Sequence, residues 1–190
     1  FSDYTSNKLW ERVINKASRL YGRAYKEDLH SQYIQHISEV VQANLVDETG
    51  ETFHLNQISA SQKIAEMEFY FKLDDFNTAK LNQLSDLYEL NTNHDFKGMM
   101  NGFIDLFFEY KGKYYILDWK SNHLGSELTA YDNEGTSQAM KDNNYHLQYL
   151  IYTVALKRFL KNRITDFDYK QHFGGVFYLF LRGVRANEAS

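Results

Sequence analysis

The chain of 190 residues contains neither cysteine nor proline. Without cysteine it can form no disulfide and no thiolate metal site, which fits a reducing cytoplasm as its location. Its apolar runs all fall short of the ~20 residues that a membrane-spanning helix needs, and no signal peptide is visible. The composition therefore indicates a cytoplasmic protein with no membrane partner. We have no physical account of the missing proline.

Several chemistries also lack their sequence signatures. The chain has no glycine-rich phosphate loop, no dinucleotide-binding fingerprint and no Ser-His-Asp set. Its formal net charge is −4, whereas free-standing DNA-binding proteins tend to be basic. If the partner is DNA, either the basic groups are local, as in residues 157–163, or other parts of a larger assembly deliver the DNA.

What the chain does contain is apolar and aromatic side chains. Hydrophobic residues make up 43% and aromatic residues 16%, which indicates a folded chain with a substantial core. The length suits one domain over residues 1–190. Because the sequence starts at Phe1 rather than at Met, we expect this domain to be a fragment of a longer chain.

Residues 98–120 predict two strands joined by a tight turn at residues 111–112. Aromatic and β-branched residues fill both arms, as strands favour. Side chains alternate between the two faces of a strand, so a two-residue turn places Asp105 directly opposite Asp118, with the Cβ atoms ~5 Å apart. Lys120 lies two residues beyond Asp118 and shares its face. Two carboxylates and one ammonium group are therefore expected to converge on one face of the hairpin.

The opposed carboxylates of Asp105 and Asp118 need compensation. Opposed like charges destabilise a sheet, and carboxylates removed from water must be paired, protonated or bound to a metal ion. Lys120 can neutralise only one of the two. A divalent cation resolves the conflict, because Mg²⁺ takes hard oxygen ligands from one or two carboxylates. The alternative is an ordinary ion pair between Asp118 and Lys120 on a solvated face, but the apolar run YYILDWK favours the metal site.

Hydrophobic periodicity and chain breakers place the other elements. We expect helices over residues 6–21, 24–44, 77–90 and 137–161, strands over 63–73 and 174–183, a turn over 47–51 and a polar loop over 121–135. His30 and His36 lie on the second of these helices. A lone histidine on a helix is more often a surface or core residue than a metal ligand.

Other polar side chains are candidates for contacts beside the hairpin. Glu68 points either to the active face or to a solvated edge, and the role of Glu66 is equally open. Three candidates directly follow the hairpin and either contact substrate or are simply exposed: Ser121, Asn122 and His123. Gln148 and Tyr152 are four residues apart and so share one face of the long helix. From the residues alone, Tyr152 is better explained as a core aromatic.

Ordered motifs along the chain give a more specific indication. GFID is followed thirteen residues on by DWK, and then by QYLIY in a later helix. Together with EMEFYF, GFIDLFF, YYILDWKSNHLG, NYHLQYLIYTVALKRFL and HFGGVFYLFLRG, this set resembles the PD-(D/E)xK nuclease superfamily. More narrowly, it resembles the RecB-type nuclease domain that ends the β subunit of exodeoxyribonuclease V, the RecBCD helicase-nuclease. The similarity covers most of the chain from about Gln57 to Gly183.

The resemblance implies an α/β fold with a restriction-endonuclease-like core, in which helices flank a central mixed β-sheet. It implies a nuclease of the exodeoxyribonuclease V type, which hydrolyses DNA with Mg²⁺ within a helicase-nuclease that acts in double-strand-break repair and recombination. The implied partners are DNA, a helicase part of the same polypeptide, and RecC- and RecD-type subunits. The family's Q-x-x-x-Y motif matches Gln148 and Tyr152, which would line the site and contact the DNA strand.

The resemblance also assigns roles within the hairpin. Asp105, Asp118 and Lys120 would be the catalytic residues. Both carboxylates and the backbone carbonyl of Trp119 would hold Mg²⁺, and Lys120 would orient the attacking water. Replacing Lys120 with alanine should then abolish cleavage and leave folding nearly intact.

One family feature has no match in the chain. RecB-type domains carry a further metal ligand, a histidine on a helix that the family order places just before Phe1. His30 and His36 match no such motif. We therefore expect the isolated chain to bind Mg²⁺ weakly and to cut DNA poorly or not at all. The alternative function is a non-catalytic module of the same fold, for DNA docking or protein–protein interaction.

Overall fold

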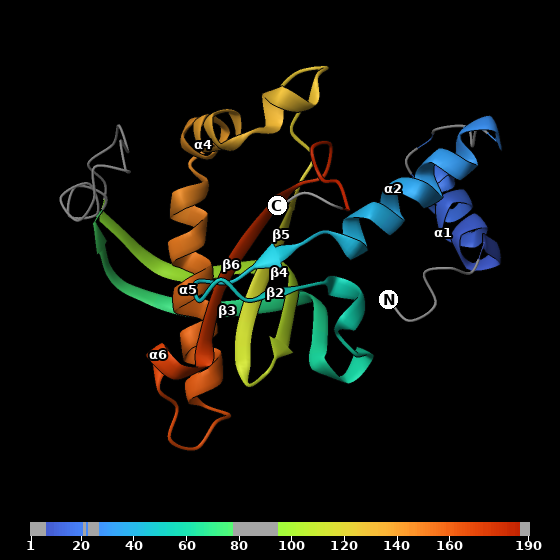
Figure 1. Ribbon diagram of the computed structural model, residues 1–190. Helices are drawn as coiled ribbons and strands as arrows, with labels where there is room; N and C mark the ends of the chain where they lie inside the picture. The colour runs from blue at the N-terminus through green and yellow to red at the C-terminus, as the bar shows by residue number, and fades with distance from the viewer. Residues whose placement is uncertain (1–6, 21, 23–26, 78–94, 187–190) are drawn as a thin grey trace. The chain divides into compact units, whose positions relative to one another are not determined.

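The structure is a computed structural model that describes residues 7–20, 22, 27–77 and 95–186 (Figure 1). The chain divides into two compact units: residues 1–63 with 184–190, and residues 64–183. All residues of the site expected from the sequence lie in the second unit. The single domain expected over residues 1–190 stays a prediction.

The first unit is mainly helical. Its elements are α1 (Asn7–Leu20), the 3-10 turn η1 (Glu27–Leu29), α2 (His30–Gln42), the strands β1 (Leu45–Val46) and β2 (Thr52–Phe53), and the 3-10 turns η2 (Leu55–Gln57) and η3 (Ala60–Gln62). The helix predicted over residues 6–21 is confirmed as α1, and the helix predicted over 24–44 is confirmed over residues 30–42 as α2. The predicted turn joins the antiparallel strands β1 and β2, where the Asp47 carboxylate accepts the backbone N–H groups of Thr49 and Glu51 at 2.8 and 3.0 Å.

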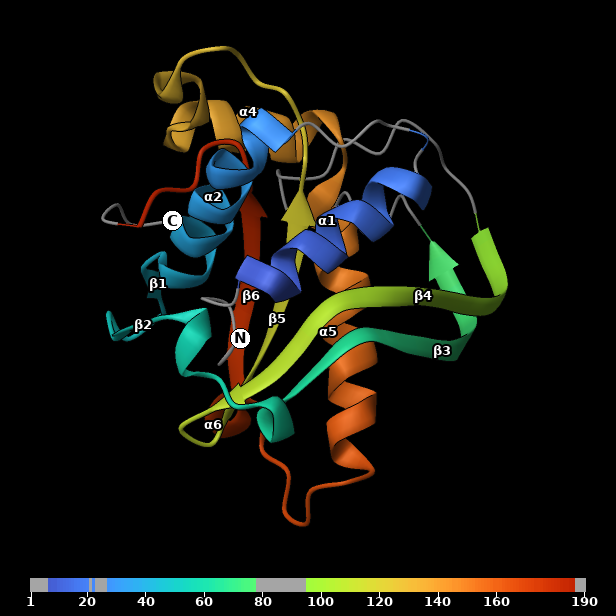
Figure 2. The ribbon, with the colours of Figure 1, turned by 90° about the vertical axis from the view of Figure 1, so that its right-hand side faces the viewer.

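The second unit is built on a mixed sheet of four strands in the order β3-β4-β5-β6. The strands are β3 (Lys63–Asn77), β4 (Asp95–Tyr110), β5 (Lys113–Lys120) and β6 (Phe173–Phe180). β5 pairs antiparallel with β4 and parallel with β6. The long strands β3 and β4 run side by side in both views (Figures 1 and 2).

The hairpin between β4 and β5 has the predicted turn and the predicted register. Lys111 and Gly112 both have positive φ, at 50° and 78°, as a two-residue turn of type I′ requires. The N–H of Gly112 donates to the Glu109 carboxylate at 2.7 Å. The paired residues run from Tyr110↔Lys113 to Leu106↔Leu117, and one further step in the same register brings Asp105 opposite Asp118.

The helix α5 (Tyr145–Lys161) packs its apolar side on one face of this sheet (Figure 1, orange). It contributes Ala155, Leu156 and Leu160 to a core cluster with side chains of three strands: Met67, Phe69, Phe71, Ile104, Phe107 and Ile116. The helix α4 (Asn133–Asp142) lies against α5, and α6 (Tyr169–His172) lies against β5 and β6. This mixed sheet with its flanking helices is the α/β architecture expected from the sequence, and it is consistent with a restriction-endonuclease-like core.

The opposite face of the sheet is also buried where β4, β5 and β6 pair. Tyr115 of β5 stacks between Phe108 of β4 and Phe177 of β6, with ring centroids 5.2 and 5.8 Å apart. A side chain at Gly174 would meet the Tyr115 ring at 2.3 Å, so only glycine fits there. Burial on both faces explains why β5 is an almost continuous apolar run.

The prediction of a single helix over residues 137–161 is wrong. The chain forms two helices instead, because Asn144 takes the left-handed conformation (φ 54°, ψ 33°) between α4 and α5. Asparagine tolerates that conformation better than most residues, since its short polar side chain bonds locally. This turn changes the direction of the chain, and α5 then starts beside the end of β5.

The polar loop predicted over residues 121–135 is shorter than expected. It ends in the 3-10 turn η4 (Leu128–Tyr131), and α4 follows at once. The Asp132 carboxylate caps α4 by accepting the N–H groups of Glu134 and Gly135 at 3.0 and 2.9 Å.

Two further predictions concern the ends of strands. The last strand ends at Phe180, before the predicted limit at residue 183, and none of its residues is exposed. Asn77, the first residue of the helix predicted over 77–90, is the last residue of β3, and residues 78–90 lie outside the described residues. None of the helices described above combines the length and apolar character that a membrane span requires.

Candidate active site

The last residues of β5 carry a buried ion pair. Lys120 Nζ lies 2.6 Å from Asp118 Oδ2, and the two side chains are only 7% and 5% exposed. Strand alternation explains the burial, because Asp118 and Lys120 share a face with Ile116, which belongs to the core cluster under α5. Asp118 and Lys120 therefore do form an ion pair, but the prediction that this pair lies on a solvated face is wrong.

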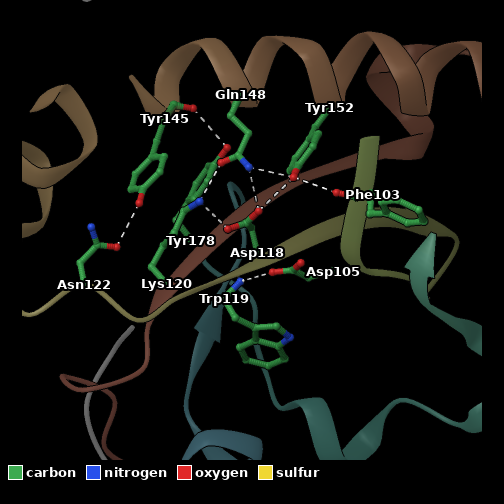
Figure 3. Close-up of polar contacts among 10 residues, drawn as sticks. All are labelled: Phe103, Asp105, Asp118, Trp119, Lys120, Asn122, Tyr145, Gln148, Tyr152 and Tyr178. Carbon is green, nitrogen blue, oxygen red and sulfur yellow. Dashed lines mark hydrogen bonds and ion pairs between the residues drawn. The ribbon is translucent and has the colours of Figure 1, made fainter. Parts of the chain in front are cut away.

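Gln148 bridges both charges of this pair. Its Oε1 accepts a hydrogen bond from Lys120 Nζ at 2.7 Å, and its Nε2 donates to Asp118 Oδ1 at 3.1 Å. Gln148 lies in the first turn of α5, and Figure 3 shows its side chain reaching from the helix to the pair. An amide carries an acceptor and donors together, so it satisfies opposite charges without adding one.

Tyr152, one turn further along α5, is both a core aromatic and a site residue. Its hydroxyl accepts from Gln148 Nε2 at 2.8 Å. The same hydroxyl lies within donating distance of the Phe103 carbonyl, at 2.9 Å, and of Asp118 Oδ1, at 3.2 Å. A phenol has one proton, so it serves one of these two acceptors at a time. Its ring packs edge-on against Phe69, with centroids 5.9 Å apart.

Asp105 reaches the site from the neighbouring strand, β4. Its Oδ2 accepts the backbone N–H of Trp119 at 2.8 Å, just beyond the last paired residues of the β4–β5 ladder. The carboxylate therefore satisfies a backbone donor that the ladder leaves open at this point. This contact ties Asp105 to the backbone between Asp118 and Lys120, as Figure 3 shows. The structure thus brings the three charged residues of the hairpin together on one side, as predicted.

Burial, together with a surplus of negative charge, perturbs the ionisable groups of the site. Burial raises the pKa of the Asp118 carboxyl above its ordinary value, and the charge of Asp105 raises it further. The hydrogen bond and charge of Lys120 and the hydrogen bond of Tyr152 act in the opposite direction. Burial also raises the pKa of Tyr152, followed by the charge of Asp118, so its phenol stays protonated and able to donate.

The oxygen atoms gathered here suit a hard divalent cation. The carboxylates of Asp105 and Asp118 and the backbone carbonyl of Trp119 are ligand types that Mg²⁺ prefers, and a cation would offset the charge that raises the pKa of Asp118. Within the described part of the chain, no group of three or more His, Cys, Asp or Glu side chains is placed to hold a metal ion. The two carboxylates would therefore need backbone oxygens, waters or further groups to complete the coordination.

The remaining candidates from the sequence are not part of this cluster. Glu68 is exposed on the side of β3 opposite Met67 and Phe69, which pack toward α5, so the solvated edge is its observed position. Glu66 is exposed and has a positive φ of 51°. Ser121 and His123 are exposed in the loop after β5, and both histidines of α2 belong to the first unit.

Two tyrosines that the sequence prediction missed enclose Lys120. Its Nζ lies 3.6 Å from the ring centroid of Tyr145 and 5.1 Å from that of Tyr178. Tyr145 stands three residues before Gln148, and this helical spacing could have pointed to it. Tyr178 faces Asp118 across the parallel pair β5–β6, and no local signal in the sequence reveals that register.

Comparison with known proteins identifies relatives of the chain. No protein-family model matches the chain. The chain is 46% identical over 156 residues to the RecBCD enzyme subunit RecB of Escherichia coli (strain K12), an alignment that covers 78% of the chain and 13% of that subunit. It is 36% identical over 197 residues to the subunit of the same name from Haemophilus influenzae, which covers 100% of the chain and 16% of the relative.

Another relative matches over a shorter segment. The RecB subunit of Mycobacterium tuberculosis (strain H37Rv) is 42% identical over 89 residues, which is 46% of the chain and 8% of that subunit. In each case the chain spans only a small part of the relative's length. With the mixed α/β fold, these alignments show that the chain belongs to the RecB family as a RecB-type domain.

Proposed function

We propose that this RecB-type domain hydrolyses phosphodiester bonds of DNA with Mg²⁺ as its cofactor. The observation that carries the proposal is the buried arrangement in which Lys120, Gln148 and Tyr152 all contact Asp118. A buried ion pair adds little stability compared with well-packed apolar residues of similar volume. Chemistry at this position therefore explains the buried charges better than stability does.

The carboxylates would hold the cation in a fixed orientation. Asp105 and Asp118 would be ligands of Mg²⁺, together with the backbone carbonyl of Trp119. When bound, Mg²⁺ supplies Lewis acidity that polarises the scissile phosphate and lowers the pKa of the attacking water. The hydroxyl of Tyr152 and the amide of Gln148 orient Asp118 through its Oδ1, and the N–H of Trp119 orients Asp105.

Lys120 would act on the reacting phosphate. Its ammonium group would orient the attacking water and stabilise the negative charge that develops on the phosphate oxygens. Contacts with Asp118 and Gln148 hold the ammonium group of Lys120 in place before substrate binds, so the reaction costs it little further conformational entropy. Gln148 and Tyr152, which lie on the same helix face, would also line the path of the DNA strand.

The relatives suggest the setting in which this chemistry occurs. They are named as RecB subunits of RecBCD enzymes, and the chain corresponds to a small part of each. We therefore extend the proposal to a helicase-nuclease of double-strand-break repair and recombination. Its partners would be DNA, a helicase part of the same polypeptide, and RecC- and RecD-type subunits. Delivery of DNA by those parts would account for the chain's net charge of −4.

Cleavage of linear DNA by the full-length subunit in the presence of Mg²⁺ tests the proposal. Asp118→Asn keeps the shape of the side chain but removes its charge, and it should slow cleavage by about 100-fold or more. The matched control is Asp142→Asn, an exposed carboxylate that accepts a hydrogen bond from Gln138 at 2.7 Å, and it should cut like the wild type.

Two results would overturn the proposal. Cleavage by Asp118→Asn at the wild-type rate would remove Asp118 from the reaction. Binding of DNA without cleavage by the wild-type subunit would favour the alternative, a non-catalytic module of the PD-(D/E)xK fold for DNA docking or protein–protein interaction.

A further inference from the structure

The ammonium group of Lys120 is enclosed on three sides. Asp118 Oδ2 lies at 2.6 Å, Gln148 Oε1 at 2.7 Å, and the centroid of the Tyr145 ring at 3.6 Å. The two oxygens are hydrogen-bond acceptors, whereas the ring presents its electron-rich face to the cation. Such cation–π contacts gain strength when the partners are removed from water, as Lys120 is here.

Tyr145 is itself held in place by Asn122 and Tyr178. Its hydroxyl donates to Asn122 Oδ1 at 3.0 Å, which links the start of α5 to the loop after β5. Its ring stacks on Tyr178, with centroids 6.0 Å apart and an interplanar angle of 16°. The Tyr178 hydroxyl donates to the Tyr145 backbone carbonyl at 3.2 Å. The ring face therefore has a defined position over Lys120, which Figure 3 shows.

A ring face holds a cation differently from a carboxylate. A second carboxylate would pair with Lys120 through directional hydrogen bonds and would add to the negative charge around Asp118. An aromatic face attracts the ammonium without accepting a strong, directional bond. It leaves the N–H groups able to turn toward a phosphate oxygen while the nitrogen stays in position.

We propose that Tyr145 is a positioning residue for Lys120, and that the stacked ring of Tyr178 holds Tyr145 in place. The ring confines the Lys120 nitrogen between α5 and the end of β5 and keeps water from one side of it. The inference rests on the proposed nuclease function, in which Lys120 stabilises the reacting phosphate. Its structural part, the enclosure of Lys120 by the Tyr145 ring, is open to a test that needs no cleavage.

Two substitutions at Tyr145 separate the ring from the hydroxyl. In the full-length subunit, Tyr145→Leu removes the aromatic face, and it should lower kcat for DNA cleavage by about 10-fold or more while KM changes less than about 2-fold. Tyr145→Phe keeps the face and loses only the bond to Asn122, so its kcat should stay within about 3-fold of the wild type. If the leucine variant does not fold, Tyr145→Met serves the same comparison.

Acylation of lysines, read by peptide mass spectrometry on the full-length subunit, tests the enclosure directly. Lys120 should be acylated faster in Tyr145→Leu than in the wild type. In Tyr145→Phe it should be acylated at the wild-type rate. The matched control is Tyr169→Leu. It also removes a ring beside a lysine, because the Tyr169 ring lies 5.5 Å from Nζ of Lys157, an exposed residue of α5. That variant should leave the acylation of Lys120 and the rate of cleavage unchanged.

Each other outcome has a definite meaning. Wild-type kcat in Tyr145→Leu overturns the inference, and so does a rise in KM at constant kcat, which would make Tyr145 a DNA contact. Equal losses in the leucine and phenylalanine variants would assign the effect to the bond with Asn122 and also overturn it. If the wild type cuts no DNA, the proposed function fails, while faster acylation of Lys120 in Tyr145→Leu still supports the enclosure.

Discussion

Replacing Lys120 with methionine removes an ammonium group from a carboxylate that has almost no access to water. Methionine has a similar length and volume, so packing under α5 changes little. The partner, Asp118, keeps its negative charge with its side chain only 5% exposed. Its Oδ1 still accepts from Gln148 and Tyr152, but its Oδ2 loses the contact at 2.6 Å.

The expected loss of stability is large for a single substitution. Removing one partner of a buried ion pair costs about 3–5 kcal/mol, because the remaining charge is left uncompensated. With a urea dependence of about 2 kcal/mol per molar, the unfolding midpoint should fall by about 1.5–2.5 M. Adding Asp118→Asn to Lys120→Met should restore at least about 1 kcal/mol, because neither charge is then left alone.

The loss should also depend on pH. Lys120 lowers the pKa of Asp118, so its removal raises that pKa further above the unfolded value. Between the unfolded pKa and the raised one, the folded variant holds a proton on Asp118 that the unfolded chain releases, so its stability falls as pH rises through this window, and above it Asp118 carries its full negative charge. The deficit relative to the wild type should therefore be smaller at pH 5 than at pH 7.

Urea unfolding followed by circular dichroism at both pH values measures these differences. Lys161→Met, an exposed lysine near the end of α5, is the control and should stay within about 0.5 kcal/mol of the wild type. A loss below about 1 kcal/mol for Lys120→Met would show that the pair behaves like a surface salt bridge. A double variant as unstable as the sum of its two single variants would show that the charges do not act as a unit.

Three further predictions concern other parts of the chain. Tyr152→Phe should cost about 1–3 kcal/mol in urea unfolding and should slow DNA cleavage, because it leaves buried polar partners unsatisfied. Thermal unfolding should show a loss of about 1 kcal/mol for Asn144→Ala, which strains a left-handed position, and a gain of about 0.5 kcal/mol for Lys111→Asn, which favours the type I′ turn. Calorimetry with Mn²⁺ should show weaker binding by the 190-residue chain than by a longer protein, if the resemblance correctly implies an upstream helix with a ligating histidine. Equal binding would bring His30 and His36 back as possible ligands.

The hairpin could be predicted because several local signals agree. Residues alternate along both arms, and the Lys111–Gly112 turn fixes which residues face one another. The convergence of Asp105, Asp118 and Lys120 follows from that register alone. Gln148 and Tyr152 needed the family motif in addition, because helical spacing says which residues share a face but not what that face covers.

The rest depends on contacts that are distant in the sequence. Apolar residues recur on both sides of Asn144, so periodicity alone does not reveal the break between α4 and α5. The stacking of Tyr178 on Tyr145 requires the parallel pairing of β6 with β5 across the intervening helices. The burial of Lys120 depends on α5 in the same way. The sequence therefore favoured an Ala variant that folds normally, whereas the structure predicts a marked loss of stability.

The hydroxyl of Tyr152 has two acceptors within reach of its one proton. Its single proton can point to Asp118 Oδ1 or, by rotation about the C–O bond, to the carbonyl of Phe103. In either orientation the oxygen still accepts from Gln148. Asp118 can therefore turn an oxygen toward a new partner while the phenol remains fully hydrogen-bonded. Exchange of partners at Asp118 then needs only the rotation of one hydrogen atom, so the empty and loaded forms of the site can share a single backbone.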